Sequence, residues 1–227
     1  MSRGVVRRVS ACIGVLGLLV LGVAAAPASA GTGADEIGAA EWYEAADDAV
    51  AEIEATDWAA ISAQQGCRLV DVEVTEVVDP ELNAAIGAPA DLAVPVVERE
   101  ERCGGLDSSM VAGSGLRTTV APGSDCSTTS GPGTLCISRS GSYVTTSFRY
   151  NGSGTVKAYL RIYKISSSAS GCPTGTTLAT SSTASYSNGT QRSLSVYAPS
   201  SGAFSSYVWR YVALNHYTAW GSACGVL

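Results

Sequence analysis

The stretch that most constrains the fold of this 227-residue chain is residues 142–165, SYVTTSFRYNGSGTVKAYLRIYKI. In it, two segments that alternate inward- and outward-facing residues flank one turn signal. The apolar faces of the two segments consist of Val144, Thr146, Phe148 and Tyr150, and of Val156, Ala158, Leu160 and Ile162. Asn151-Gly152 between them is a pair that tight hairpin turns favour. The stretch therefore predicts a β-hairpin whose apolar face the rest of the chain must cover.

Residues 1–30 have the three parts of a secretory signal peptide, in a bacterial style. Arginines at the start precede an apolar run over residues 13–26, and Ala28-Ser29-Ala30 forms a small-residue cleavage site. The apolar run is short and rich in alanine and glycine, which disfavours a membrane span, although an uncleaved anchor is the alternative. We therefore expect a secreted, extracellular protein with no stable membrane anchor after signal cleavage.

Six cysteines follow the signal segment, and an even number in an exported chain favours disulfides over free thiols. Fifteen pairings are open to six cysteines. The pairs that stay within one segment of the chain, and that we expect, are Cys67–Cys103, Cys126–Cys136 and Cys172–Cys224. There is no C-x-x-C, and the single histidine, His216, cannot complete a Cys/His zinc site alone. We expect no metal and no cofactor.

Charge divides the chain into two parts. Residues 31–107 contain 19 acidic residues against three arginines, a net charge of −16, whereas residues 108–227 contain eight basic residues against Asp125, a net charge of +7. Such asymmetry predicts association, either between the two parts or with separate partners. The positive charge is spread thinly and the protein is acidic overall, so nucleic acid is not an expected partner.

Residues 31–103 predict a small acidic α/β module that begins with helix. Apolar residues at helical spacing over residues 34–65 predict an amphipathic helix, a break near Thr56 and a second short helix after it. Gly66 ends the helical region. The acidic helix is expected to lie over Arg149, Lys157 and Arg161 or to await a basic partner, with Trp42, Val50 and Ile53 as its apolar contact.

Two strands complete this module. Residues 67–79 alternate as a strand, and Asp79-Pro80 indicates the start of a short helix. Residues 92–102 predict a second strand, placed at a sheet edge because it contains Pro95.

Residues 104–125 have the Gly, Ser, Thr and Pro composition of a flexible linker. Turn signals recur after it, so residues 126–227 predict an antiparallel β-sandwich and the whole chain a mainly β protein. Asn188-Gly189 predicts a second hairpin, and residues 204–217 predict the longest strand.

Motifs for catalysis are absent from the sequence: it has no H-E-x-x-H, G-x-S-x-G, Walker or dinucleotide-binding pattern. His216 and Asp125 could join a serine in a hydrolytic triad, but nothing in their spacing supports one. Catalytic residues are therefore not assigned, and an extracellular hydrolase is kept as an alternative function.

The binding residues that we predict are Tyr207, Trp209, Tyr211, Trp42 and Ile53. The first three alternate along one strand and could form a flat platform on which a sugar ring stacks. The alternative is that this strand lies centrally, with both of its faces covered.

Residues 126–227 resemble the small disulfide-bonded β-domains that actinobacteria secrete, in layout and in the ending WGSACGVL. The order of signal, acidic extension and compact β-domain is also similar to that of the adaptor subunits of umbrella-shaped secreted toxin particles. The similarity lies in organisation, so it transfers no functional residue.

Together these features predict a secreted, non-catalytic binding or assembly protein that presents a β-sandwich and an acidic helical arm. A protein partner is expected, with a glycan as the alternative ligand. A further alternative is a precursor in which residues 31–107 form a cleaved prosegment.

Overall fold

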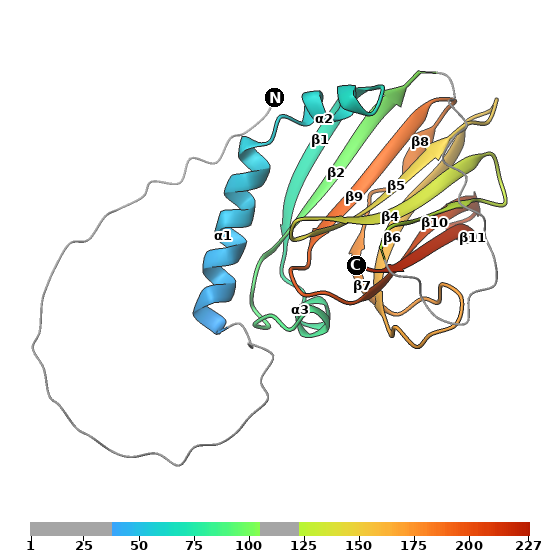
Figure 1. Ribbon diagram of the computed structural model, residues 1–227. Coiled ribbons are helices and arrows are strands. Elements are labelled where there is room, and N and C mark those ends of the chain that lie inside the picture. The colour runs from blue at the N-terminus through green and yellow to red at the C-terminus, as the bar shows by residue number, and fades with distance from the viewer. Residues whose placement is uncertain (1–37, 105–122) are drawn as a thin grey trace, which may run out of the picture. The chain divides into compact units, whose positions relative to one another are not determined.

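The computed structural model describes residues 38–104 and 123–227 (Figure 1). They fold into two antiparallel β-sheets that pack face to face, with three helices. This confirms the prediction of a mainly β protein with a sandwich preceded by helix. The signal peptide over residues 1–30 and most of the predicted linker lie outside the described residues.

The first sheet has six strands in the order β1-β2-β9-β5-β4-β3. Their bounds are β1 Cys67–Val77, β2 Val94–Cys103, β3 Asp125–Thr128, β4 Gly133–Ser140, β5 Tyr143–Tyr150 and β9 Thr190–Tyr197. The second sheet has the order β11-β10-β6-β7, and β8 also pairs with β6. Its strands are β6 Val156–Ile165, β7 Thr176–Thr180, β8 Ala184–Tyr186, β10 Ala203–Ala213 and β11 His216–Val226.

The core lies between the sheets and follows from the alternation of the strands. Phe148 from β5, Leu160 from β6 and Leu194 from β9 are fully buried there. Burying a side chain of this kind contributes about 1.5–3 kcal/mol, so the facing strands stabilise each other through these contacts.

The predicted hairpin of residues 142–165 is wrong in its pairing, although both of its strands exist. β5 pairs with β4 and β9 in one sheet, whereas β6 pairs with β10, β7 and β8 in the other. The chain therefore crosses from sheet to sheet between these strands. Their apolar faces meet across the sandwich instead of lying side by side in one sheet.

Gly152 explains why the turn signal was misleading. Hairpin turns use the Asn-Gly pair for positive φ angles, but Gly152 is not among the glycines with positive φ. A Cβ at this position would lie 2.2 Å from the hydroxyl oxygen of Tyr150 and 2.7 Å from Pro132. The glycine is needed for close packing of a crossover loop.

The second predicted hairpin, at Asn188-Gly189, is also a crossover. β8 before it pairs with β6, and β9 after it lies in the first sheet. Here Gly189 does have a positive φ of 78°, so the turn itself is tight while the strands separate.

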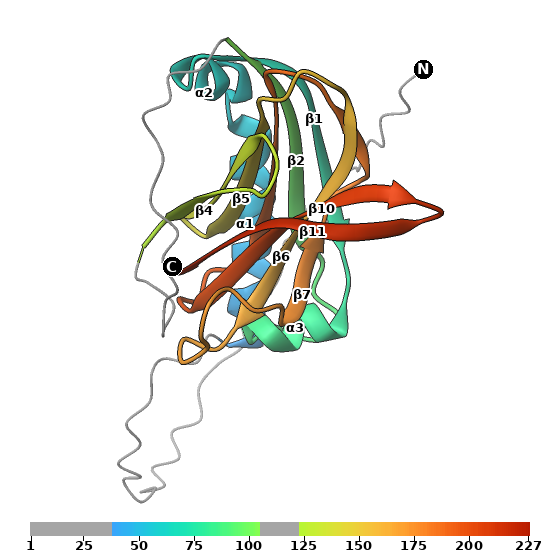
Figure 2. The ribbon, with the colours of Figure 1, turned by 90° about the vertical axis from the view of Figure 1, so that its right-hand side faces the viewer.

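The predicted long strand over residues 204–217 is interrupted by a turn. Leu214 and Asn215 have φ angles of 47° and 60°, and β10 and β11 pair antiparallel on either side of them. Residues beyond Arg210 in β10 pair with β11 alone, so the end of this hairpin extends past β6, as Figure 2 shows. Leu214 at its tip is 96% exposed.

The break near Thr56 and the helix start at Asp79-Pro80 lie where the sequence predicts, and α1 and α2 lie within the predicted helical range of residues 34–65. α1 covers Ala39–Ala55, and α2, Trp58–Gln64, follows a break at Thr56. The carboxylate of Asp57 accepts a hydrogen bond from the Ala60 N–H and caps α2. α3, Pro80–Ile86, is capped by Asp79 and ends at Gly87 in the left-handed region.

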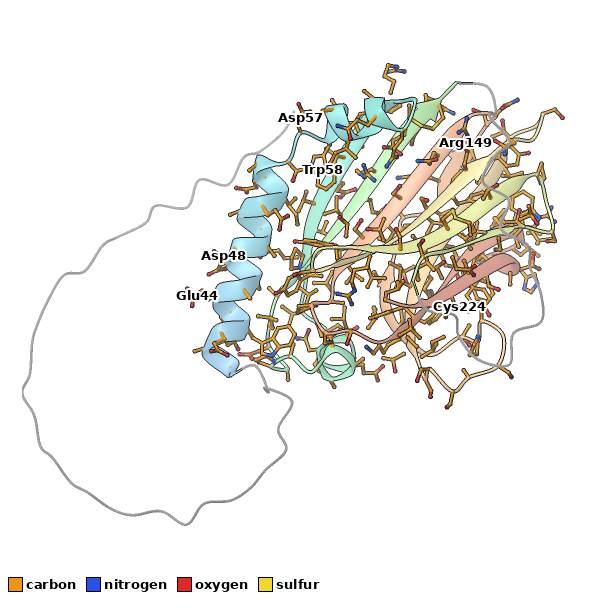
Figure 3. All side chains as sticks on the ribbon, viewed as in Figure 1. Glu44, Asp48, Asp57, Trp58, Arg149 and Cys224 are labelled. Atoms are coloured by element: carbon orange, nitrogen blue, oxygen red, sulfur yellow. A yellow bond between two sulfur atoms is a disulfide. The ribbon has the colours of Figure 1, made fainter. Side chains whose placement is uncertain are left out.

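α1 lies against the outer face of the six-stranded sheet. The ring of Trp42 packs edge-on against Tyr197 at 6.3 Å, and the hydroxyl of Tyr143 donates to the Ala49 carbonyl at 3.0 Å. Glu44 and Asp48 are on the opposite, solvent-facing side of the helix (Figure 3).

This packing corrects the predicted site of α1. Lys157 and Arg161 belong to β6 in the other sheet, and Arg149 donates to the Gly104 carbonyl. Trp42 and Ile53 are each 3% exposed. Both are therefore core residues, and the apolar stripe of α1 contacts the sheet of its own chain.

A buried ion pair between Glu101 and Arg99 holds α2 against the six-stranded sheet. Glu101 is fully buried and accepts from Ser62 at 2.6 Å, and its oxygen lies 3.3 Å from the Arg99 guanidinium. Arg99 also lies over the Trp58 ring at 5.0 Å. Burial lowers the pKa of Arg99, and the charge of Glu101 opposes that shift.

β2 joins the acidic segment to the rest of the fold, so the two predicted modules share one sheet. Residues Val96–Arg102 of β2 pair with β9, which makes β2 an interior strand and not the predicted edge strand. Pro95 is compatible with this position because it precedes the stretch paired with β9. Residues 38–104 and 123–227 belong to one compact unit.

The three predicted disulfides are confirmed. Cys67–Cys103 joins β1 to β2, Cys126–Cys136 joins β3 to β4, and Cys172–Cys224 joins a loop to β11. None of them connects residues 38–104 with residues 123–227, so those parts are held together by non-covalent contacts as well as by the chain.

Removing Cys172–Cys224 by alanine substitution is expected to lower the free energy of unfolding by about 4 kcal/mol. Its cysteines are 52 residues apart, whereas those of Cys126–Cys136 are 10 apart. Loop-closure entropy then predicts a loss about 1.5 kcal/mol smaller for the second pair. Urea unfolding of both double variants measures the difference; an equal or reversed order would contradict the entropic origin.

Tyr143→Phe is expected to make the alkaline loss of stability less steep. Burial, then the charge of Glu52, raises the pKa of Tyr143 in the folded protein. Its contribution is therefore fully present below about pH 10, the unfolded pKa, and is lost as the pH rises above it. Urea unfolding from pH 8 to 11 measures the slope; slopes identical in variant and wild type would contradict the assignment.

Candidate functional site

The outer face of the five-stranded sheet carries a dense group of aromatic side chains. Because side chains alternate along a strand, every second residue of β6 and β10 points to this outer face, together with one residue of β11. These residues are Tyr159, Arg161, Tyr163, Tyr207, Trp209, Tyr211 and Tyr217. All except the buried Tyr163 are half-buried. We call these seven residues the aromatic face.

Trp209 is the centre of the aromatic face. Its ring stacks with Tyr207 at 5.5 Å and with Tyr159 at 6.3 Å, with interplanar angles of 20° and 18°. Tyr217 meets the Tyr159 ring edge-on at 4.8 Å, and Tyr211 meets Tyr217 at 5.4 Å. Such pairs contribute about 0.5–1.5 kcal/mol each beyond burial, so the rings hold one another in place.

Arg161 introduces a cation among the rings. Its guanidinium carbon lies 5.2 Å from the centroid of Tyr159 and 6.0 Å from that of Tyr163. Its Nε donates to Thr180 at 2.9 Å, which orients the group along the sheet. No ion pair to Arg161 occurs within the described residues, so its charge is open to an external acceptor.

Two hydroxyl groups connect the aromatic face to neighbouring loops. Tyr207 donates to the carbonyl of Cys172, the loop half of a disulfide, and Tyr217 shares a hydrogen bond of 3.1 Å with Thr183. Burial raises the pKa of both Tyr159 and Tyr207. Their phenols are therefore neutral donors at neutral pH.

The aromatic face is on the side of the sandwich opposite α1. The principal contacts of the helices are those of α1 with β2, α2 with β1 and α3 with β7. In Figure 2 the strands β6, β10 and β11 face the viewer with no helix in front of them. Within the described residues, therefore, no helix covers this face of the strand.

The sequence identified part of this site. Tyr207, Trp209 and Tyr211 are together as predicted, but Tyr159 and Arg161 were not assigned to it. Their signal was available, since residues 157, 159, 161 and 163 alternate with the apolar positions of β6. What the sequence could not show is that β6 lies next to β10.

The residues considered for hydrolysis are far apart. His216 is exposed at the start of β11, whereas Asp125 accepts a hydrogen bond at 3.3 Å from the N–H of Cys224 near its end. Eight residues of strand separate these positions, roughly 25 Å. His216 and Asp125 therefore do not meet in a triad.

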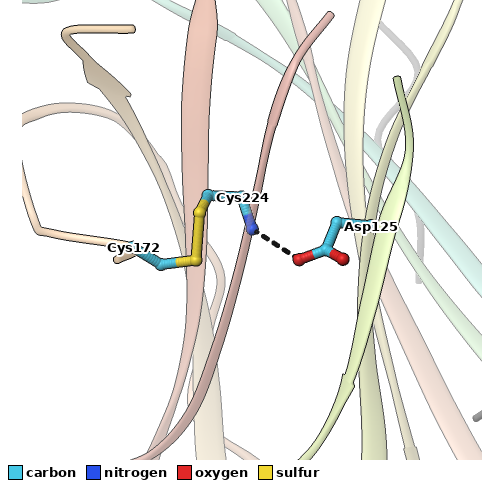
Figure 4. Close-up of side chains that lie close together, drawn as sticks. All are labelled: Asp125, Cys172 and Cys224. Atoms are coloured by element: carbon cyan, nitrogen blue, oxygen red, sulfur yellow. Dashed lines mark hydrogen bonds between the residues drawn. A yellow bond between two sulfur atoms is a disulfide. The ribbon is translucent and has the colours of Figure 1, made fainter. Parts of the chain in front are cut away.

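Asp125, Cys172 and Cys224 form the one cluster in the described ranges with the spacing of metal ligands (Figure 4). Both sulfur atoms belong to a disulfide. Because thiolates, and not disulfide sulfurs, bind metals, the cluster has a structural function in this state.

Comparison of the chain with protein-family models, curated proteins and solved structures finds no match. Within residues 38–104 and 123–227, no helix has the length and apolar character needed to span a membrane. The site is therefore interpreted from its own chemistry.

Tyr207→Phe is expected to lower the free energy of unfolding by about 1 kcal/mol, because it removes the hydrogen bond to the Cys172 carbonyl. Tyr211→Phe is the matched control, since no hydrogen bond of the Tyr211 hydroxyl is found within the described residues. Urea midpoints of the two variants measure the difference. Equal midpoints would mean that the Tyr207 hydroxyl does not hold the loop.

Proposed function

We propose that this is a secreted, non-catalytic binding protein that holds a protein partner on the aromatic face. The observation that carries the proposal is the group of six interlocked rings beside Arg161, of which five are half-buried and Tyr163 is buried. Tyrosine, tryptophan and arginine are the side chains that most often dominate binding energy in protein interfaces. Rings already fixed by their neighbours lose little conformational entropy on binding.

Ring orientation favours a protein over a glycan. A sugar stacks on an open ring face, but Trp209 uses its ring to stack with Tyr207 and Tyr159. The surface is a cluster of closely packed rings with one cation, which suits an apolar protein patch bordered by a carboxylate. Glycan binding is the second candidate because parallel aromatic rings on a sheet also occur in sugar platforms.

Retention of the acidic segment is part of the proposal. β2 supplies Val94 and Val96 to the core and pairs with β9, so cleavage and release of residues 31–107 would expose an interior strand. The three disulfides favour an oxidising compartment. The resemblance to adaptor subunits of secreted toxin particles is a further reason to search for a protein partner.

Trp209→Ala is expected to weaken partner binding at least 30-fold, the effect of losing a central interface residue of about 2 kcal/mol. A photo-crosslinking residue at position 211 identifies the partner in the native secretome, and titration of purified partner gives the affinity. Tyr43→Ala is the matched control because Tyr43 is an exposed aromatic residue on α1.

Two outcomes would contradict this function. Equal binding by wild type and Trp209→Ala would exclude the aromatic face as the interface. Binding of wild type to a soluble polysaccharide, lost in Trp209→Ala, would establish the glycan alternative in place of a protein partner.

A further inference from the structure

β1 is an edge strand with one unpaired side. It pairs with β2 from Cys67↔Cys103 to Val77↔Val94, and no other strand of the described residues pairs with it. Figure 2 shows β1 at the margin of its sheet. Backbone N–H and C=O groups that do not point to β2 are therefore available for pairing with another strand.

The edge is long and is protected by charge. Edge strands are often short or carry lysine or proline, but β1 has 11 residues with neither and carries Arg68, Asp71, Glu73 and Glu76 instead. A bulge between Leu69 and Asp71 interrupts its start and leaves residues 71–77 regular. Val74 and Val77 in this stretch are 42% and 37% exposed.

Acidic residues face one another across β1 and β2. Asp71 is opposite Glu100, and Glu73 is opposite Glu98, so the four carboxylates share one face of the sheet. Like charges in opposite positions destabilise a strand pair.

Only the inner pair of these acids is neutralised. Arg192 on β9 lies 3.6 Å from Glu98 and 3.9 Å from Glu100. Asp71 and Glu73 are exposed and have no ion pair within the described residues. The uncompensated charge therefore lies directly beside the open edge.

We infer that residues 71–77 of β1 bind an extended basic segment of a partner protein by strand addition. Main-chain hydrogen bonds to the edge supply affinity in this mode, and alternate side chains supply specificity. Lysine or arginine at every second position would meet Asp71 and Glu73. The intervening apolar residues would lie beside Val72 and Val74 on the other face.

Charge also excludes a second copy of this chain as the occupant. Pairing β1 with another β1 would bring Asp71, Glu73 and Glu76 close to the same three residues of the copy. The acids therefore prevent self-association while they select a basic strand. The site is separate from the aromatic face, which belongs to the other sheet.

The test uses the full, disulfide-bonded protein and two acetylated, amidated peptides, KVKVKVT and EVEVEVT. Calorimetry is expected to show binding of the basic peptide at least 30-fold tighter than that of the acidic one. Amide hydrogen exchange is expected to slow at alternate residues within 71–77. Absence of basic-peptide binding, or binding without this protection, would overturn strand addition.

Matched variants separate the site from general electrostatic attraction. The double variant Asp71→Asn/Glu73→Gln is expected to weaken basic-peptide binding at least tenfold. Glu44→Gln/Asp47→Asn changes the net charge equally at exposed positions of α1 and is expected to alter the affinity less than twofold. Equal loss in both variants would overturn the proposal in favour of non-specific attraction.

Trp209→Ala distinguishes this inference from the proposed function. That variant is expected to bind the basic peptide like wild type, because Trp209 lies in the second sheet. Loss of peptide binding in Trp209→Ala would place the peptide on the aromatic face and overturn the β1 site.

Discussion

Pairing of β2 with β9 is the interaction on which the rest of the structure depends. It joins residues 38–104, which have a net negative charge, to residues 123–227, which have a net positive charge, in one sheet. No disulfide makes that connection. Arg192 on β9 lies within 4 Å of two glutamates of β2. Partly buried pairs of this kind are screened less by salt than surface pairs. The charge asymmetry of the sequence is therefore used inside the fold, along a strand boundary.

Local signals in the sequence predicted the elements well and their pairing poorly. Caps at Asp57 and Asp79, and the period-two pattern of β5 and β6, depend on neighbouring residues and were sufficient to place helices and strands. An Asn-Gly pair looks the same in the sequence whether it forms a hairpin turn or part of a loop that crosses between sheets. Whether Gly152 serves a positive φ or close packing against Tyr150 depends on residues that are distant in sequence.

The candidate site shows the same limit. Alternation identified Tyr207, Trp209 and Tyr211 as one side of a strand, but the neighbours that complete the aromatic face come from β6 and β11. Trp42 and Ile53 were predicted to contact either the β-domain or a partner, and the structure buries both within this chain. An apolar stripe on an acidic helix fits a partner or the chain's own core equally well from sequence, and here Tyr143 and Tyr197 supply the covering surface.

The two sheets leave different surfaces open because different elements cover them. α1 and α2 pack on the outer face of the first sheet, and the edge of that sheet at β1 is unpaired within the described residues, so it can offer backbone groups. No helix of the described residues lies on the outer face of the second sheet, which offers side chains instead. Since β1 is acidic and the aromatic face contains Arg161, the two proposed sites predict partners of opposite charge. Partners that bound these two proposed sites would not compete, which is the property that a protein linking two others requires.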